Sequence, residues 1–337
     1  MKKVLQIIDL HVSFRTYGGS VQAVRGVNVD VYEKETLAIV GESGCGKSVT
    51  SQSIMQLLPT YSASVDQGEI WFRDRNLLSL SEKDMRTIRG VDISMIFQDP
   101  MTALNPTLTI GDQLMEAGKE HQKLTKKEVK EAAIHMLNLV GIPQPKERLK
   151  QYPHQFSGGM RQRLMIAMAL ICKPQVLIAD EPTTALDVTI QAQILELFKD
   201  IQRKTGVTII LITHDLGVVA QVADRVAVMY GGKIVEVGTR RDIFYSPQHP
   251  YTKGLLQSVP RLDMTDELIP IEGSPPDLFA PPKGCPYTER CQQAMKVCDH
   301  MMPHETQRSP THTVHCWLQD ERAKQTIVSS TQRGSFL

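Results

Sequence analysis

The 337-residue chain lacks a charge excess of either sign, a long apolar run and an evident export signal. Its 38 basic and 37 acidic side chains nearly cancel, which argues against a protein that binds nucleic acid through overall positive charge. No run of 18 or more apolar residues occurs, so we expect no segment that crosses a membrane. The first residues place two lysines before a short, interrupted apolar stretch, which is unlike a signal peptide and favours the cytoplasm.

Cysteine is rare before residue 285, where only Cys45 and Cys172 occur. The other four follow the spacing C-x5-C-x6-C-x17-C near the end of the chain: Cys285, Cys291, Cys298 and Cys316. In a reducing compartment such clustering favours a metal site over disulfides. Four thiolates can hold an iron–sulfur cluster or tetrahedral zinc, although the tight C-x2-C pairs usual for zinc are absent. Four free thiols are the alternative, and in a zinc site a histidine can replace one thiolate: His300, His304, His312 or His315.

Short apolar runs alternate with segments of helical periodicity over roughly the first 240 residues. The predicted strands are Val4–Ile8, Val27–Val31, Leu37–Val40, Ile93–Phe97, Val176–Ala179 and Val207–Thr213. The predicted helices cover residues 47–58, 112–149 and 189–202. Continuous apolar strands between helices are typical of a mostly parallel sheet that is covered on both faces. The sequence therefore predicts an α/β fold.

The composition of the chain changes near residue 245. Prolines are dense from Ser246 to Pro282, which argues against long helices and predicts an irregular, appended region. The last residues, from Ala323, are polar with few core-forming side chains, which predicts a loose tail. We therefore expect a main domain over residues 1–240, an extension over residues 241–320 and a tail over residues 321–337.

One glycine-rich loop carries the strongest chemical signal in the sequence. It matches G-x-x-x-x-G-K-[ST], follows a predicted apolar strand and opens a predicted helix. Backbone N–H groups in such a loop point at phosphates, and the following helix adds its positive end. Lys47 can then reach the β- and γ-phosphates, and the Ser48 hydroxyl can ligate Mg²⁺. The candidate nucleotide-binding residues here are Gly41, Glu42, Ser43, Gly44, Cys45, Gly46, Lys47, Ser48 and Val49.

Polar side chains follow three other predicted strands. Asp180 and Glu181 end one strand, Gln98 follows a second and His214 follows a third. Ligands of an open parallel sheet bind at the carboxyl ends of its strands, so we expect these side chains to approach the glycine-rich loop. An aspartate at a strand end can hold Mg²⁺, and the adjacent glutamate can activate an attacking water.

The segment Phe156–Gln162, with the letters F-S-G-G-M-R-Q, resembles the signature motif of ATP-binding-cassette (ABC) ATPases, usually written LSGGQ. A serine and two glycines that open a helix suit anion binding. The order of the motifs resembles that of an ABC nucleotide-binding subunit over about residues 4–240. The resemblance implies a P-loop NTPase cassette with a RecA-like core, an antiparallel β-subdomain and a helical subdomain at about residues 100–157, followed by the Pro- and Cys-rich C-terminal extension.

The resemblance also implies a role for each matching residue on the phosphate side of the site. Lys47 and the loop backbone would bind the phosphates of ATP. The Mg²⁺ ion would be organised by Ser48, Gln98 and Asp180. The catalytic residues would be Glu181 as the general base, His214 at the γ-phosphate and Gln98.

Further implied contacts lie at the adenine and at a second subunit. Tyr17 is expected to stack on the adenine, with Phe14 as the alternative. Asp187 would connect the two nucleotide sites of a dimer, and Met160 departs from the family, which usually has glutamine there. One phosphate loop and one signature motif in the chain imply that a site is completed by a partner. The ATP of that partner would be contacted by Ser157, Gly158 and Gly159.

Four shorter segments resemble the D-type ATPase subunits of bacterial dipeptide and oligopeptide importers: Phe97–Pro100, Leu104–Pro106, Ser246–Thr252 and Glu272–Pro276. This resemblance implies ATP-driven peptide import at the cytoplasmic face of the cell membrane. The implied partners are a second ABC ATPase in a hetero- or homodimer, two transmembrane permeases and an extracytoplasmic peptide-binding protein, with no nucleic acid. Some members of this subfamily carry a [4Fe-4S] cluster on late cysteines. The alternatives are an importer of nickel or another solute, and a soluble ABC ATPase outside transport.

Overall fold

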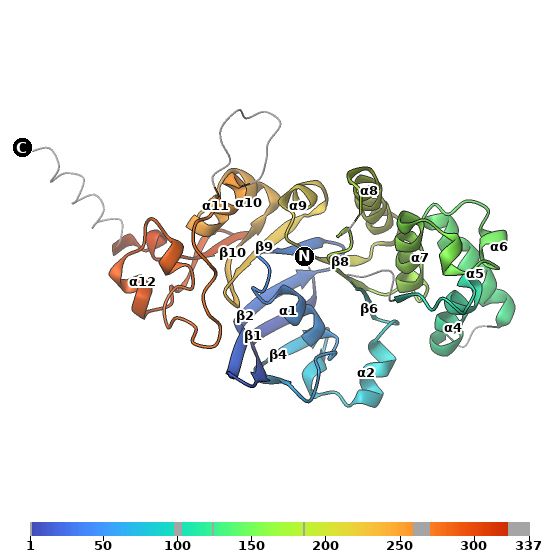
Figure 1. Cartoon of the computed structure of the whole chain (residues 1–337), viewed down its shortest axis with the longest axis horizontal. Helices are drawn as coiled ribbons and strands as arrows, with labels where there is room; N and C mark the ends of the chain where they lie inside the picture. The colour runs from blue at the N-terminus through green and yellow to red at the C-terminus, as the bar shows by residue number, and fades with distance from the viewer. Residues whose placement is uncertain (1, 98–102, 123–124, 185, 259–269, 323–337) are drawn as a thin grey trace, which may run out of the picture.

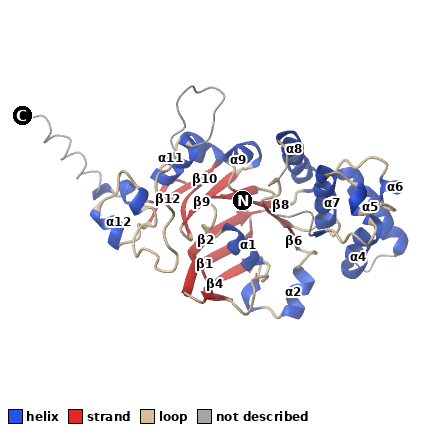
Figure 2. Cartoon of the chain, viewed as in Figure 1, coloured by secondary structure: helices blue, strands red, loops and turns tan. Residues whose placement is uncertain are grey.

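The computed structural model of the chain describes residues 2–97, 103–122, 125–184, 186–258 and 270–322. They form two β-sheets with helices packed around them, and a helical lobe lies at one end of the molecule (Figures 1 and 2). Gln98, which the sequence places at the nucleotide site, lies outside the described residues, as does the predicted tail from Ala323 onward.

The larger sheet has eight strands in the order β11-β12-β10-β9-β3-β8-β7-β6. Its strands from β9 to β6 run parallel, and β3, β7 and β8 are buried at every residue, which confirms the predicted α/β fold. The bounds are β3 Thr36–Val40, β6 Ile93–Ile96, β7 Val176–Asp180, β8 Thr208–Thr213, β9 Arg225–Tyr230, β10 Lys233–Thr239, β11 Glu305–Ser309 and β12 His312–His315.

The smaller sheet is antiparallel, in the order β2-β1-β4-β5. Its strands are β1 Lys3–Thr16, β2 Gly19–Tyr32, β4 Ala63–Phe72 and β5 Arg75–Asn76. The first two are much longer than the predicted runs Val4–Ile8 and Val27–Val31. Asp9 has a φ of 46°, and the pairing register of β1 with both β2 and β4 shifts across it. The alternation of inward and outward side chains that marks a strand is therefore interrupted there.

The helices cover the large sheet and build the lobe, in which α4 to α7 pack together (Figure 1). The helical stretch predicted over residues 112–149 is divided in the structure, because a capping box between Thr125 and Glu128 starts a new helix and Pro145 begins another. No helix among the described residues has the length and apolarity needed to cross a membrane. The helices are α1 Lys47–Ile54, α2 Glu82–Ile88, α4 Ile110–Gln122, α5 Lys126–Leu139, α6 Pro145–Arg148, α7 Gly158–Leu170, α8 Val188–Thr205, α9 Leu216–Val222, α10 Arg240–Tyr245, α11 Pro250–Gln257 and α12 Lys296–His300.

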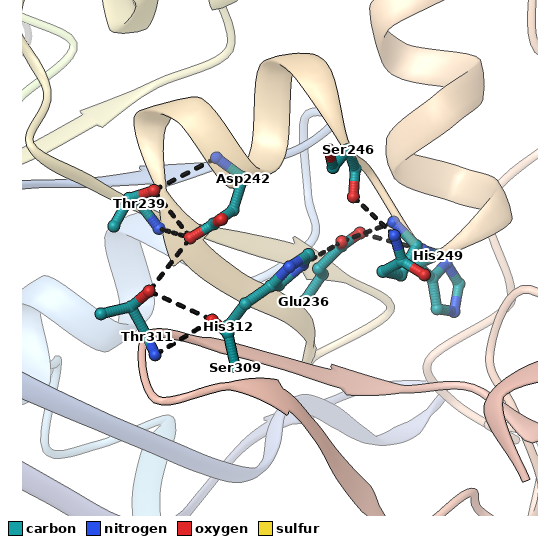
Figure 3. Close-up of polar contacts among 9 residues, drawn as sticks. Glu236, Thr239, Asp242, Ser246, His249, Ser309, Thr311 and His312 are labelled. Atoms are coloured by element: carbon teal, nitrogen blue, oxygen red, sulfur yellow. Dashed lines mark hydrogen bonds and ion pairs between the residues drawn. The ribbon is translucent and has the colours of Figure 1, made fainter.

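The C-terminal region is joined to the large sheet. Strand β12 pairs with β10, and the fully buried carboxylate of Glu236 on β10 accepts a 2.7 Å hydrogen bond from His312 Nε2 (Figure 3). The same carboxylate accepts backbone N–H groups of Gln248 and His249. Burial would raise the pKa of Glu236, but these hydrogen bonds outweigh it and hold the pKa below its ordinary value.

Over Ser246–Pro282, where the sequence predicts an irregular region without long helices, the described residues contain one short helix, α11, and no strand. Pro250 stands in the first turn of α11. A backbone N–H there would have no partner within the helix, so proline costs no helical hydrogen bond. The hairpin β11–β12 follows the proline-rich stretch and extends the large sheet. One hydrophobic core cluster contains side chains from before and after residue 245, among them Tyr230, Tyr251 and Trp317.

Candidate nucleotide site

The glycine-rich loop connects the end of β3 to the start of α1. Gly46 has a φ of 105°, and a Cβ atom there would lie 2.4 Å from the backbone oxygen of Ala23, so only glycine fits. Lys47 is buried, and its ammonium group donates hydrogen bonds of 2.8 and 2.9 Å to the backbone oxygens of Gly41 and Glu42. The positive charge is thus held inside the curve of the loop, where an anion can reach it.

Ser48 and Asp180 meet although 132 residues separate them in sequence. The hydroxyl of Ser48 donates a 3.0 Å hydrogen bond to Oδ1 of Asp180. Burial raises the pKa of the Asp180 carboxyl, with the negative charge of Glu181 adding to the effect, although the Ser48 hydrogen bond works against it. A hydroxyl and a carboxylate in contact beside a phosphate loop form an oxygen-rich pair of the kind that Mg²⁺ prefers.

Glu181 and His214 form a second pair at the same edge of the sheet. His214 Nδ1 lies 3.1 Å from one oxygen of the Glu181 carboxylate, and the Thr184 hydroxyl donates a 3.0 Å hydrogen bond to the other. Burial would raise the pKa of Glu181, but these two hydrogen bonds hold it below its ordinary value, so the carboxylate is ionised at neutral pH. The backbone of Glu181 has a φ of 46°, a strained conformation for a non-glycine residue.

Sheet order explains why these residues meet. The strands β3, β8 and β7 are neighbours, and they run parallel, so the loop after β3, His214 after β8 and the carboxylates of β7 emerge at one edge. The sequence placed all of them at strand ends, and the structure brings them together.

The signature segment opens α7 in a different part of the chain (Figure 1). Ser157 is the N-cap of α7, and its hydroxyl accepts the backbone N–H of Met160 at 3.4 Å. Gly158 is exposed, whereas a Cβ atom on Gly159 would lie 2.7 Å from Ile190 of α8. Asp187 caps α8 in the same way, accepting the N–H of Ile190.

Two candidate residues for the adenine differ in exposure. Tyr17 lies in the turn between β1 and β2 and is fully exposed, whereas Phe14 packs against the core. Tyr17 is thus the more accessible of the two rings, and Phe14 is half-buried.

Sequence reasoning missed Gln162, whose side chain donates a 2.7 Å hydrogen bond to the backbone oxygen of Pro182. This buried contact ties the signature helix to the segment that follows the strand-end carboxylates. The sequence signal for this residue is its position inside the signature segment Phe156–Gln162.

The four late cysteines line one small pocket, together with His249 and Trp317. Burial raises the pKa of the Cys285 thiol to about 12 and that of Cys316 to about 11. In the part of the chain that the structure describes, no group of three or more His, Cys, Asp or Glu residues is placed as a ready metal-ligand set. The four thiols therefore share a pocket, but they are not placed as the ligands of a single metal ion.

Two solved structures similar to this chain belong to ABC proteins. The dimeric ATP-binding cassette MJ0796 bound to ADP and Pi has a TM-score of 0.62 and 25% identity, covering 70% of this chain and 99% of its own. CbiO1 from Clostridium perfringens, part of the ABC transporter complex cbiONQ, has the same TM-score and 28% identity, covering 73% of this chain and 92% of its own. A family model described as "ABC transporter" matches residues 24–184. Fold and motifs together define an ABC-type ATPase.

Relatives of higher sequence identity identify the family within the ABC-type ATPases. The chain is 71% identical to the dipeptide transport ATP-binding protein DppD of Bacillus subtilis, over 98% of both chains. It is 58% identical to the oligopeptide transport ATP-binding protein OppD of the same species, over 94% of this chain and 89% of the relative. A model described as "Oligopeptide/dipeptide transporter, C-terminal region" matches residues 235–298. The chain belongs to the family of ATP-binding subunits of dipeptide and oligopeptide ABC transporters.

Proposed function

We propose that this chain binds ATP and Mg²⁺ at the loop Gly41–Ser48 and hydrolyses ATP to power the import of dipeptides or oligopeptides. The observation that carries the proposal is the meeting of two pairs at one sheet edge, Ser48 with Asp180 and Glu181 with His214. The first pair supplies oxygen ligands for Mg²⁺. The second holds an ionised carboxylate where it can take a proton from an attacking water.

The chain's own residues have separate tasks in this proposal. Lys47 leaves its backbone partners for the phosphates, and the N–H groups of the loop bind the β-phosphate. The imidazole of His214 orients the Glu181 carboxylate and reaches the γ-phosphate. Tyr17 stacks on the adenine, and Gln98 joins the Mg²⁺ ligands.

A second ATPase subunit completes each site. The exposed Ser157 and Gly158 at the start of α7 present a hydroxyl and N–H groups to a ligand outside the chain. ATP held by a partner subunit fits that position, and Asp187 caps α8, the helix whose Ile190 packs against Gly159. ATP then favours the associated state because it contacts both subunits.

The proposed setting is the cytoplasmic face of the cell membrane. Two permeases bind the helical lobe at about residues 100–157, and a peptide-binding protein acts through the permeases from outside. The cassette spans residues 1–240, and the extension spans residues 241–320. Support comes from the relatives, which are transport subunits by name.

Peptide uptake tests the proposed substrate class. Deleting the gene in its native host should lower the initial rate of uptake of a radiolabelled dipeptide, because the permeases lose their ATPase. The wild-type chain supplied in trans should restore uptake, whereas a Lys47→Ala chain, expressed to the same level, should not. Unchanged dipeptide uptake together with a loss of ⁶³Ni uptake would replace the peptide by nickel as the solute.

We further propose that the late cysteines hold a [4Fe-4S] cluster, with zinc as the alternative. Four thiols that line one pocket supply the sulfur donors that such a cluster takes. His249 lines the same pocket, and its buried Nε2 has no hydrogen-bond partner among the described residues. Its Nδ1 accepts the N–H of Tyr251, so Nε2 carries the proton and can donate to a sulfur atom. The cluster would supply a covalent link between segments too short to bury a core of their own.

Metal analysis of the anaerobically purified chain decides between these occupants. A cluster should give about four iron and four acid-labile sulfide per chain and an absorbance band near 400 nm. Replacing Cys298 by serine should remove the iron, whereas the same change at Cys172, outside the pocket, should not. Zinc without sulfide would favour the alternative, and a metal-free, colourless chain would contradict both.

A further inference from the structure

Glu42 belongs to the glycine-rich loop, but its side chain turns away toward the C-terminal extension. Its carboxylate Oε2 accepts a 2.8 Å hydrogen bond from Arg290 Nη1, a residue 248 positions later. Its backbone N–H donates to the hydroxyl of Tyr251 at 3.0 Å. Both partners lie beyond residue 245, so the extension contacts the loop through one residue in two ways.

Arg290 is held for this contact by its own surroundings. Its side chain is only 6% exposed. Its other N–H groups donate to the backbone oxygens of Ile271 and Glu272 and to the Tyr230 hydroxyl. Burial disfavours the charged guanidinium, but the hydrogen bonds to Glu42 and Tyr230 outweigh it and raise the pKa of Arg290 above its ordinary value. The planar fork of arginine is needed to reach these four partners together.

We propose that Arg290 is a positioning residue for ATP binding: it neutralises and fixes Glu42, so that the extension sets the affinity of the loop for phosphate. This inference rests on the proposed nucleotide site. An unpaired carboxylate in the loop would repel the phosphates, because both carry negative charge in a partly buried setting. Pairing with Arg290 removes that repulsion and turns the carboxylate away from the ligand.

The same contact connects the loop to the cysteine-lined pocket. Arg290 ends the 3-10 turn Thr288–Arg290, which lies between Cys285 and Cys291. The backbone N–H of Cys285 donates a 2.7 Å hydrogen bond to the backbone oxygen of Cys298. This bond connects the segment just before the turn to another cysteine of the pocket. A change that moves this turn therefore moves the partner of Glu42.

Equilibrium binding of a non-hydrolysable ATP analogue with Mg²⁺ to the full chain tests the proposal. Arg290→Gln should raise the dissociation constant about tenfold, the effect typical of losing a hydrogen bond to a charged group. Adding Glu42→Gln to Arg290→Gln should restore most of the affinity, since the repelling charge is then gone. A merely structural role for Arg290 predicts no such rescue, and a double variant as weak as Arg290→Gln overturns the proposal. An unchanged dissociation constant in Arg290→Gln overturns it as well.

Two controls keep the outcome clear. Arg86→Gln removes an exposed arginine–glutamate pair on α2 and should leave the dissociation constant unchanged. If Arg290→Gln loses its cooperative thermal unfolding, Arg290→Met replaces it, because methionine also removes the positive charge, and equal effects of Arg290→Met with and without Glu42→Gln overturn the proposal. A wild-type chain that binds no analogue contradicts the nucleotide site itself, whereas a wild-type chain that binds, with no coupling between the two positions, contradicts only the role of Arg290.

Discussion

Replacing Glu181 by glutamine should lower kcat for ATP hydrolysis by about 10²–10⁴-fold, the contribution typical of a general base. The amide keeps the shape of the side chain and its contacts to His214 and Thr184, but it has no carboxylate to accept a proton. ATP binding should persist, because the phosphates are held by the loop and by Lys47 on other elements. Steady-state hydrolysis and equilibrium binding, measured on the same preparation, separate the two effects.

The matched control is Glu196→Gln on α8, whose carboxylate is exposed and pairs with Lys199. It removes the same charge from the surface and should leave both hydrolysis and binding unchanged. Hydrolysis by Glu181→Gln at the wild-type rate would contradict the general-base role, and a parallel loss of ATP affinity would assign Glu181 to binding instead.

Replacing Lys47 by alanine should weaken ATP binding by about 10- to 100-fold, the range expected from losing a charge-assisted hydrogen bond. The ammonium is the one side-chain cation that the loop itself carries. It is already buried at the loop backbone, so little ordering is needed when phosphate arrives. Titration with the ATP analogue measures the change.

Lys199→Ala provides the comparison for this variant, since it removes an exposed lysine from α8. It should bind with wild-type affinity. Thermal unfolding should show whether the Lys47→Ala chain keeps its fold, because the lost hydrogen bonds to Gly41 and Glu42 are replaced by none. Full affinity in a folded Lys47→Ala chain would contradict the phosphate role.

Local pattern was sufficient for much of the parallel core. The buried strands β3, β7 and β8 read as short apolar runs, and their bounds differ from the predicted ones by a residue or less. The full length of strand β1 was harder to predict. The left-handed backbone conformation of Asp9 and the register shifts of the strand break the alternation of side chains. The strands β9 and β10 were not predicted from the sequence, because no functional motif accompanies their apolar residues.

The sequence by itself determined the chemistry of this protein. The loop Gly41–Ser48, the strand-end carboxylates and the signature segment are contiguous motifs, and the physical reason for each lies within a few residues. The tertiary structure decided which of them meet: Ser48 with Asp180, and Glu181 with His214, because strand order in a sheet depends on pairing between distant segments. It also decided that Arg290 meets Glu42 across 248 positions, a contact set by packing of the extension against the core and invisible in any local pattern.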